Sequence, residues 1–406
     1  MNLNLNLRNR LRIIANSIAF YPAALALSFL LLSYLSIQLD FSPLGKQLKS
    51  QFTWLSLHDA STARSIIATI VGGVISLTVF SFSLVMIVLN QAAAQMSNRV
   101  LEKLIGNRFQ QLVLGIYIGT IVYGLFLLTT IRDIDSGIRV PAISTYLLIL
   151  LTVFDIFIFI YFLHYITQSV KYEVIIGRIS AATLKSMKQN CCLDNDSREG
   201  EPSNFKGDFT LSAARSGIFE SVDTDALIAL CTEKNCELQV LILPGTFVFE
   251  GNDLGQISKQ LNKDENSAFA AAIFIHDTES IEENYFYGMM QLVEVALRAL
   301  SPGINDPDTA VISLRALFQL YAQRIAASPQ HIFKGKEEQQ RLYLPVLSFE
   351  KVFHDTILPI WDYGKNDRII QRNLLQLLTK FQARYKDSFS KDLLLKVQSF
   401  IQKSGY

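Results

Sequence analysis

Apolar residues gather in four long stretches within roughly the first 170 residues of the chain. The four stretches are 18–39, 65–89, 112–131 and 141–166. A helix needs about 20 residues to cross the hydrocarbon core of a membrane, so each stretch is long enough to span it. We therefore expect four transmembrane helices, with the second helix continuing to Leu104. We expect the first stretch to remain as a span, because its apolar run is too long for a cleaved signal.

The second stretch carries small and polar residues along one side. Five polar residues recur every seven positions between Arg64 and Arg99: Thr69, Ser76, Ser83, Asn90 and Ser97. Seven residues are close to two helical turns, so these residues form a polar stripe along one side of a helix. Because lipid cannot satisfy polar groups, such a side faces other helices or a water-filled path.

Two interpretations of the polar stripe stay open, a pore wall and a seam where helices pack closely. Packing accounts for the small residues Gly72, Gly73, Ala93 and Ala94 that lie between the polar positions. It accounts less well for Asn90, because a side-chain amide requires water or a hydrogen-bonding partner.

Arg64 and Arg99 lie at the two ends of the polar stripe. Each can extend to the lipid headgroups, which is sufficient to explain either residue alone. If the polar stripe lines a pore, the two arginines form cationic rings at its mouths, and such rings attract anions. We include both as pore-lining candidates.

Asp155 lies in the middle of the fourth stretch, among Ile and Phe residues. An ionised carboxylate at that depth costs a few kcal/mol or more unless it is paired, hydrated or protonated. One interpretation is a residue of an ion or proton path, which favours cations over anions. The alternative is a protonated acid that bonds to a neighbouring helix.

The charges beside the four stretches predict that both termini lie in the cytoplasm. Basic residues flank the cytoplasmic ends, at Arg8, Arg10, Arg12, Arg99, Lys103, Arg108, Lys171 and Arg178. The other two loops mix acidic and basic residues, so they are assigned to the outer side. An even number of spans independently agrees with this orientation.

The chain from about residue 178 has the composition of a soluble protein, with charges spread throughout. The whole chain has 406 residues, of which half are hydrophobic and 18% are charged, below the usual share of about 25%. Its net charge of +1 argues against a general nucleic-acid binder, which carries a basic face. We expect four parts: a transmembrane domain over 1–178, a helix end and polar linker over 179–207, a small β-barrel over 208–262, and a helical domain over 263–406.

The barrel is expected from three short segments of alternating hydrophobicity, at 217–222, 237–243 and 246–250. A short helix over 223–231 lies between the first two of them, with Asp223 or Thr224 as its N-cap. The pattern becomes helical from Asn266, and the segment 284–300 is amphipathic. Asn366 and Ser388 are candidate caps of later helices.

A short polar loop joins the helix over 284–300 to the next one. Ser-Pro-Gly ends the first helix, and Asp306 or Asn305 can cap the second, with Pro307 in its first turn. A rigid connector explains these residues. The alternative is a contact or ligand loop, because Arg298, Asn305, Asp306 and Asp308 concentrate polar chemistry in one turn.

Motifs of known enzyme classes are absent from the sequence. It contains no Gly-rich phosphate loop, GxSxG, HExxH or paired-carboxylate motif, and its five histidines are scattered. No CxxC pair or Cys/His cluster has the spacing of a zinc site. We expect no catalytic residue, no metal site and no cofactor, and we interpret the four cysteines as reduced thiols.

Several segments together resemble a bacterial family of predicted membrane proteins, the domain of unknown function 2254 family. The resemblance covers nearly the whole chain. It rests on Ala63-Arg64, on the segments 95–101, 161–164 and 244–248, and above all on the long string Arg-Ala-Leu-Ser-Pro-Gly-Ile-Asn-Asp-Pro over 298–307. It implies a multi-pass protein of the bacterial inner membrane, and the family name carries no function.

The sequence departs from the family pattern at three positions. Asn98 stands in place of a Pro, Tyr165 in place of a second His, and Asp277 in place of an Arg. The change at Tyr165 argues against a metal site made of paired histidines.

These observations favour an oligomeric ion channel, with the second helix lining the pore and the cytosolic region gating it. Four helices enclose little space, so conduction requires several copies of the chain. The expected partners are membrane lipid, other copies of the chain and inorganic ions. The alternative is a non-conducting sensor or scaffold whose cytosolic region binds a ligand or partner, and an enzyme is the weakest hypothesis.

Overall fold

The structure is a computed structural model that describes residues 20–51, 59–95, 108–131, 140–192, 205, 207–335, 339–386 and 388–403. The chain divides into two compact units, Met1–Lys171 and Tyr172–Tyr406. The expected extension of the second helix to Leu104, together with Ser97 and Arg99, lies outside the described residues.

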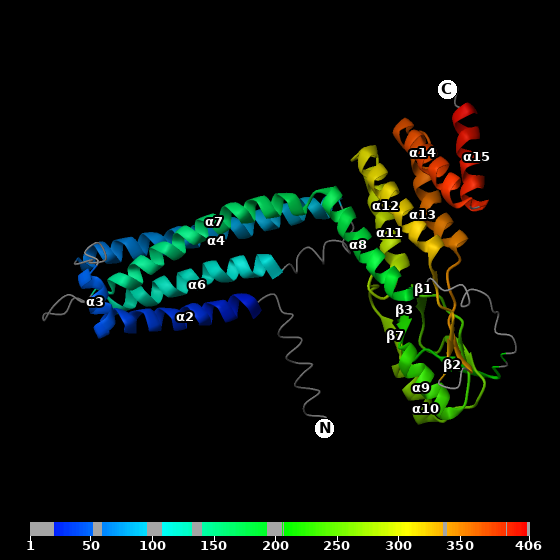
Figure 1. Cartoon of the computed structure of the whole chain (residues 1–406), viewed down its shortest axis with the longest axis horizontal. Helices are drawn as coiled ribbons and strands as arrows, with labels where there is room; N and C mark the ends of the chain where they lie inside the picture. Colours follow the sequence, from blue (N-terminus) through cyan, green and yellow to red (C-terminus); the bar gives the residue numbers. More distant parts are fainter. Residues whose placement is uncertain are drawn as a thin grey trace. The chain divides into compact units, whose positions relative to one another are not determined.

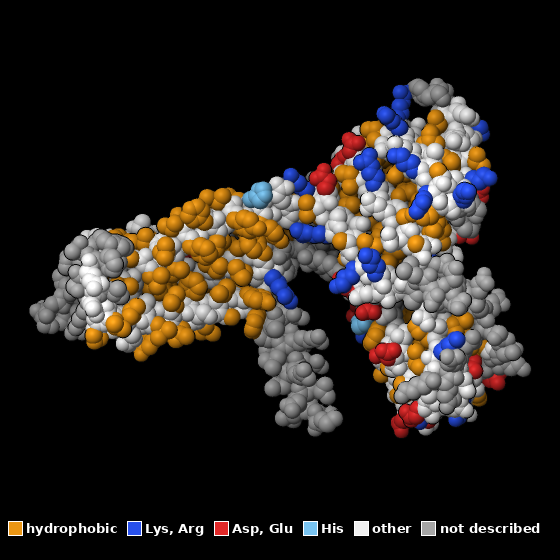
Figure 2. All heavy atoms as spheres, viewed as in Figure 1, with side chains coloured by type: hydrophobic (Ala, Val, Ile, Leu, Met, Phe, Trp, Pro, Cys, Tyr) orange, Lys and Arg blue, Asp and Glu red, His pale blue; other side chains and the backbone are white. Residues whose placement is uncertain are grey.

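The first unit consists of helices (Figure 1). They are α2 (Phe20–Phe41), α3 (Pro43–Gln51), α4 (Ala60–Gln95), α6 (Arg108–Thr130) and α7 (Ala142–Ser169). Four of them, α2, α4, α6 and α7, are long and apolar enough to cross a membrane, so the prediction of four helices that could be membrane spans is confirmed. Apolar side chains cover the visible surface of these helices in Figure 2, as contact with lipid requires.

Helices α2 and α6 pack closely through two glycines of α6. A Cβ atom on Gly115 would lie 2.6 Å from the side chain of Leu25, and one on Gly119 would lie 2.7 Å from the ring of Phe29. Any larger side chain at either position would push the two helices apart. Gly115 and Gly119 therefore form the close-approach face that the GxxxG spacing indicates.

Asp40, near the end of α2, caps the first turn of α7. Its carboxylate accepts hydrogen bonds from the backbone N–H of Ile143 at 3.1 Å and of Ser144 at 2.7 Å. The hydroxyl of Ser144 donates to the same carboxylate at 2.6 Å, and the ammonium of Lys49 in α3 lies 2.6 Å from it. The N-cap residue of α7 is Pro141, which has no side-chain oxygen to offer, so the cap comes from another helix.

The second unit combines helices with three small sheets (Figure 1). Its helices are α8 (Tyr172–Asn190), α9 (Thr224–Lys234), α10 (Lys263–Ala271), α11 (Tyr285–Ala299), α12 (Pro307–Ala326), α13 (Phe349–Gly364), α14 (Arg368–Tyr385) and α15 (Ser388–Lys403). Its strands are β1 (Cys191–Cys192), β2 (Phe209–Ser212), β3 (Gly217–Val222), β4 (Leu238–Val240), β5 (Thr246–Val248), β6 (Asp253–Ile257), β7 (Ile273–His276), β8 (Ser328–Pro329), β9 (Ile332–Lys334) and β10 (Gln340–Tyr343).

Among the described strands no closed barrel is found. The sheets have the open orders β2-β6-β4-β10-β9, β5-β3-β7 and β1-β8. Strand β10 pairs in parallel with β4, and β7 pairs with β3, so segments after residue 262 complete the sheets. The expected limits 208–262 and 263–406 are therefore crossed by strand pairing. Parallel pairing joins strands through a long connection, which local alternation in the sequence cannot indicate.

The helix starts follow the capping residues in most places. Asp223, Asn284 and Asp306 cap α9, α11 and α12 with their side chains, as the sequence predicts for the first and third. The cap of α14 is Asp367 and not its neighbour Asn366, because the Asp367 carboxylate accepts from two backbone N–H groups of the first turn.

We expect that Asp40→Asn destabilises the protein, because it leaves Lys49 without its counter-charge and weakens the cap of α7. Removing one partner of a buried, hydrogen-bonded ion pair costs roughly 3 kcal/mol. The measurement is the thermal unfolding temperature of the purified full-length protein in detergent. Asp59→Asn is the matched control, since Asp59 caps α4 at an exposed position and Asn caps a helix about as well. Equal shifts for the two variants would contradict the assignment.

Candidate functional site

The polar stripe lies on the exposed side of α4. Thr69, Ser76, Ser83 and Asn90 are all exposed, while Ser97 lies outside the described residues. The three hydroxyls each donate to the carbonyl oxygen four residues earlier on the same helix, at 2.7 to 3.0 Å. These groups are therefore satisfied within α4 and need no neighbouring helix.

The polar stripe faces away from the other helices of its own unit. A Cβ atom on Gly72 or Gly73 would have no atom within 4 Å. The buried side of α4, which includes Ile67, Val71 and Val74, lies on the opposite side of the helix. Packing inside one subunit therefore does not account for the stripe in the described part of α4.

Two large apolar side chains, Phe80 and Ile87, stand between the polar positions of the stripe and are also exposed. Together with Ser76, Ser83 and Asn90 they repeat at alternating steps of four and three residues. This spacing is typical of a helix that packs lengthwise against another helix.

Arg64 is half-buried and donates to the carbonyl oxygen of Ile131, at the end of α6, over 3.5 Å. This contact directs the guanidinium towards its own subunit. Arg99 lies outside the described residues, so the two proposed cationic rings stay a prediction.

Asp155 is buried in the middle of α7 with no exposed surface. Thr120 of α6 lies beside the carboxylate, and Tyr117 of α6 lies near Asp155 and, on its other side, near Ser81 of α4. Among the described residues, neither carboxylate oxygen and none of the three hydroxyls makes a hydrogen bond. We call these four residues the Asp155 cluster.

A cavity of about 190 Å³ between α4, α6 and α7 reaches the Asp155 cluster. Ser81 and Tyr117 line it at one level, and Leu89, Gln110 and Gln111 line it about two helical turns away. The remaining lining residues are apolar.

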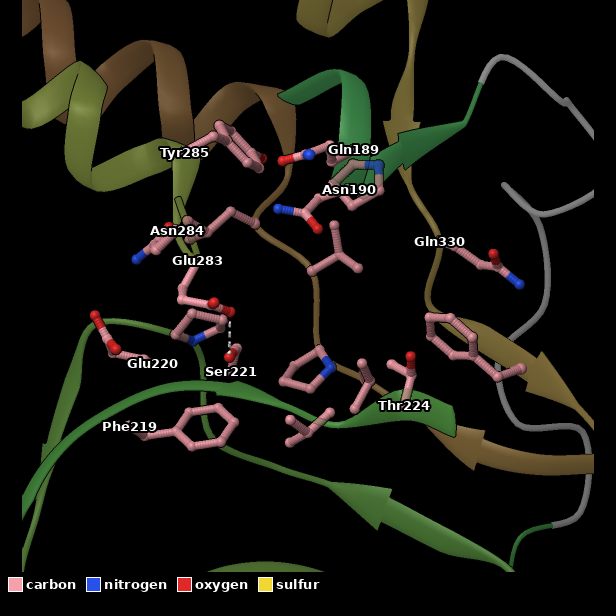
Figure 3. A pocket seen from close by; sticks show the side chains of 18 residues that line it. Gln189, Asn190, Phe219, Glu220, Ser221, Thr224, Glu283, Asn284, Tyr285 and Gln330 are labelled. Atoms are coloured by element: carbon pink, nitrogen blue, oxygen red, sulfur yellow. Dashed lines mark hydrogen bonds between the residues drawn. The ribbon is translucent and has the colours of Figure 1, made fainter. Parts of the chain in front are cut away.

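A second cavity of about 260 Å³ lies within the second unit (Figure 3). Its polar lining comes from the end of α8, from β3 and from the residues before α11. Figure 3 shows Glu283 directed towards Ser221, whose hydroxyl donates to it at 2.8 Å. Gln189 and Asn190 enter from α8. Most other lining residues are apolar, with prolines at 244, 329 and 345.

The charge of this second cavity is negative, because its described lining holds Glu220 and Glu283 but no Lys, Arg or His. Burial raises the pKa of the Glu220 carboxyl, and the nearby Glu283 and Glu282 raise it further. A hydrogen bond from the backbone N–H of Ser280 and the imidazole of His276 at 3.9 Å act in the opposite direction. The cavity therefore presents carboxylates beside an apolar wall.

The polar loop between α11 and α12 has structural tasks. Asp306 caps α12 by accepting from the backbone N–H of Thr309 at 3.1 Å and from its hydroxyl at 2.6 Å. Asn305 adopts a left-handed conformation with φ of 49°, which an Asn tolerates in a turn. Arg298 and Asp306 both act electrostatically on Tyr172 of α8. Asp308 is exposed, and a contact role of this loop stays a prediction.

The sequence analysis missed Ser81, Tyr117 and Thr120, although it selected Asp155. A signal was available, because Tyr117 and Thr120 are three residues apart and therefore share one face of α6. The lining of the second cavity was also missed, since Glu220 and Glu283 are distant in sequence. Among the described residues no group of three His, Cys, Asp or Glu side chains could hold a metal ion.

Comparison with known proteins places this chain among uncharacterised membrane proteins. The family profile described as "Predicted membrane protein (DUF2254)" matches residues 15–380. Uncharacterised proteins of Mycobacterium bovis and Mycobacterium tuberculosis are each 27% identical to the chain over an alignment of 330 residues, and the match covers 78% of this chain. The chain spans 63% of the length of these relatives. No solved structure matches it. The chain belongs to the DUF2254 family of predicted membrane proteins.

Proposed function

We propose that the chain forms an oligomeric ion channel in the bacterial inner membrane, with the polar stripe of α4 lining the pore and the second unit gating it. The observation that carries the proposal is that the most polar side of α4 faces away from its own subunit. Another copy of the chain can enclose that side. The proposed function involves no catalysis.

The chemistry of Asn90 supports a hydrated environment for the stripe. Its exposed side chain makes no hydrogen bond to another described residue, and lipid offers neither donors nor acceptors to an amide. Water in a pore satisfies such a group. The spacing of Phe80 and Ile87 within the stripe supports lengthwise contact between neighbouring copies of α4.

We expect unitary currents when the purified full-length protein is placed in a planar bilayer. Ser83→Leu adds a large apolar side chain to the stripe and should lower the unitary conductance several-fold, because it narrows and dries the pore. Phe157→Leu is the control, since Phe157 is an exposed residue of α7 and is 66% exposed. The unitary conductance of the Phe157→Leu variant should match that of the wild type.

The channel proposal fails if no unitary currents arise in either chloride or potassium salts. Equal conductance of the wild type and Ser83→Leu would remove Ser83 from the pore wall. Replacing chloride by a large anion and potassium by a large cation then shows which ion carries the current.

The second cavity favours an alternative function, a non-conducting sensor whose second unit binds a ligand. Its two carboxylates and apolar wall fit a small organic amine, because a cation can pair with Glu283 while its apolar body packs against the wall. Such a ligand stabilises the folded protein by mass action.

We expect cyclohexylamine to raise the thermal unfolding temperature of the full-length protein, and cyclohexanecarboxylate and cyclohexanol to have little effect. Glu283→Gln should abolish most of this shift. Glu282→Gln is the matched control, since the carboxylate of Glu282 is next in sequence to that of Glu283, is exposed and does not line the cavity. A shift of equal size with cyclohexanol would contradict a role for the carboxylates.

We also propose that both termini lie in the cytoplasm, on the evidence of the basic residues beside the spans. A fluorescent protein fused after Tyr406 should fluoresce in bacterial cells, and alkaline phosphatase inserted within 132–139 should be active. The opposite pattern of the two reporters would reverse the orientation.

A further inference from the structure

The Asp155 carboxylate is buried, and it has no hydrogen-bonding partner in the described part of the unit. Its surface is fully covered, and neither of its oxygens accepts a hydrogen bond from a described residue. An ionised carboxylate in hydrocarbon that lacks a counter-charge costs several kcal/mol, and such a group becomes neutral by binding a cation.

Among the described residues, the groups that act on Asp155 from the neighbouring helices are hydroxyls, and none of them is charged. Thr120 and Tyr117 come from α6 and Ser81 comes from α4, and Tyr117 is the titratable residue among them. The nearest acid of α2 is Asp40, which bonds to Ser144, eleven residues and about 16 Å along α7 from Asp155. The cluster therefore carries at most one negative charge, which matches one monovalent cation.

The number of oxygens distinguishes a proton from a metal ion. Hard metal cations take about six oxygen ligands, and the Asp155 cluster offers one carboxylate and three hydroxyls. The backbone carbonyls of the three helices are used within the helices. A proton on the carboxylate needs only one acceptor, which the hydroxyl oxygen of the adjacent Thr120 can provide.

The cavity between α4, α6 and α7 approaches this site, although Asp155 and Thr120 do not line it. Ser81 and Tyr117 belong to the cluster and also line the cavity, whose other polar residues are Gln110 and Gln111. We propose that Asp155 holds an exchangeable proton that enters and leaves through this cavity, inside a single subunit. This site is separate from the polar stripe and goes beyond the proposed channel function.

The test is infrared spectroscopy of the full-length protein in lipid nanodiscs at neutral pH. We expect a carbonyl band of a protonated carboxylic acid that is lost in Asp155→Asn and shifts when the buffer is changed to D₂O. Aspartate labelled with ¹³C should shift the same band in the wild type, which assigns it to an aspartic acid and not to a glutamic acid. Identical spectra of the wild type and Asp155→Asn overturn the proposal.

A second arm tests the identity of the cation. Exchange of potassium chloride for sodium chloride should leave the band unchanged. If sodium removes the band and potassium does not, the site binds a metal ion and the proton proposal is overturned.

A third arm tests the route by filling the cavity. Met86→Trp should slow the D₂O shift of the band several-fold, because Met86 lines the cavity. Ile75→Trp is the matched control, since Ile75 lies on the same helix, is also 43% exposed and does not line the cavity. Equal exchange rates in the two variants overturn the route.

Discussion

The hydrogen bonds between Asp40 and the first turn of α7 are the interaction on which the first unit depends. A helix start leaves backbone N–H groups without partners, and a bilayer supplies no water for them. Pro141 cannot provide the missing acceptor, so α2 provides it, with Lys49 of α3 as the counter-charge. The carbonyl of Ser144 also accepts from Tyr123 of α6, so four helices meet at this point.

The first unit treats its two buried aspartates in opposite ways. Asp40 has a cation, two backbone donors and a hydroxyl around it, and it holds the helix ends in place. Asp155 has hydroxyl neighbours from two helices and no hydrogen bond within the described residues. A buried acid whose oxygens are hydrogen-bonded and paired stabilises one packing of the helices. A buried acid without such partners is stabilised when a cation, such as a proton, binds to it. An aspartate therefore stabilises the helix ends at one depth, and at the other depth an aspartate holds the proton that we propose.

Local patterns were sufficient to predict the spans and most helix starts, because hydrophobic length and capping residues act over a few positions. The sheets were not predictable in this way, since β4 pairs with β10 about a hundred residues later. One member of the Asp155 cluster, Asp155 itself, could be predicted from the sequence, and its neighbours could not. An acid in an apolar stretch is conspicuous, but Ser81 and Thr120 become its neighbours only through the packing of α4 and α6 on α7.

The back-bonded hydroxyls of the polar stripe bear on how copies of the chain meet. Because Thr69, Ser76 and Ser83 each bond to their own helix, a lone subunit exposes few unsatisfied groups to lipid along most of α4. A single subunit can therefore insert into the membrane before it contacts another copy of the chain. Association of the proposed subunits then depends on how well their helix surfaces fit together and on the concentration of the protein in the bilayer, because burying these hydroxyls contributes little free energy. In the oligomer that we propose, subunits can therefore enter the membrane singly, and their density there governs how many copies assemble.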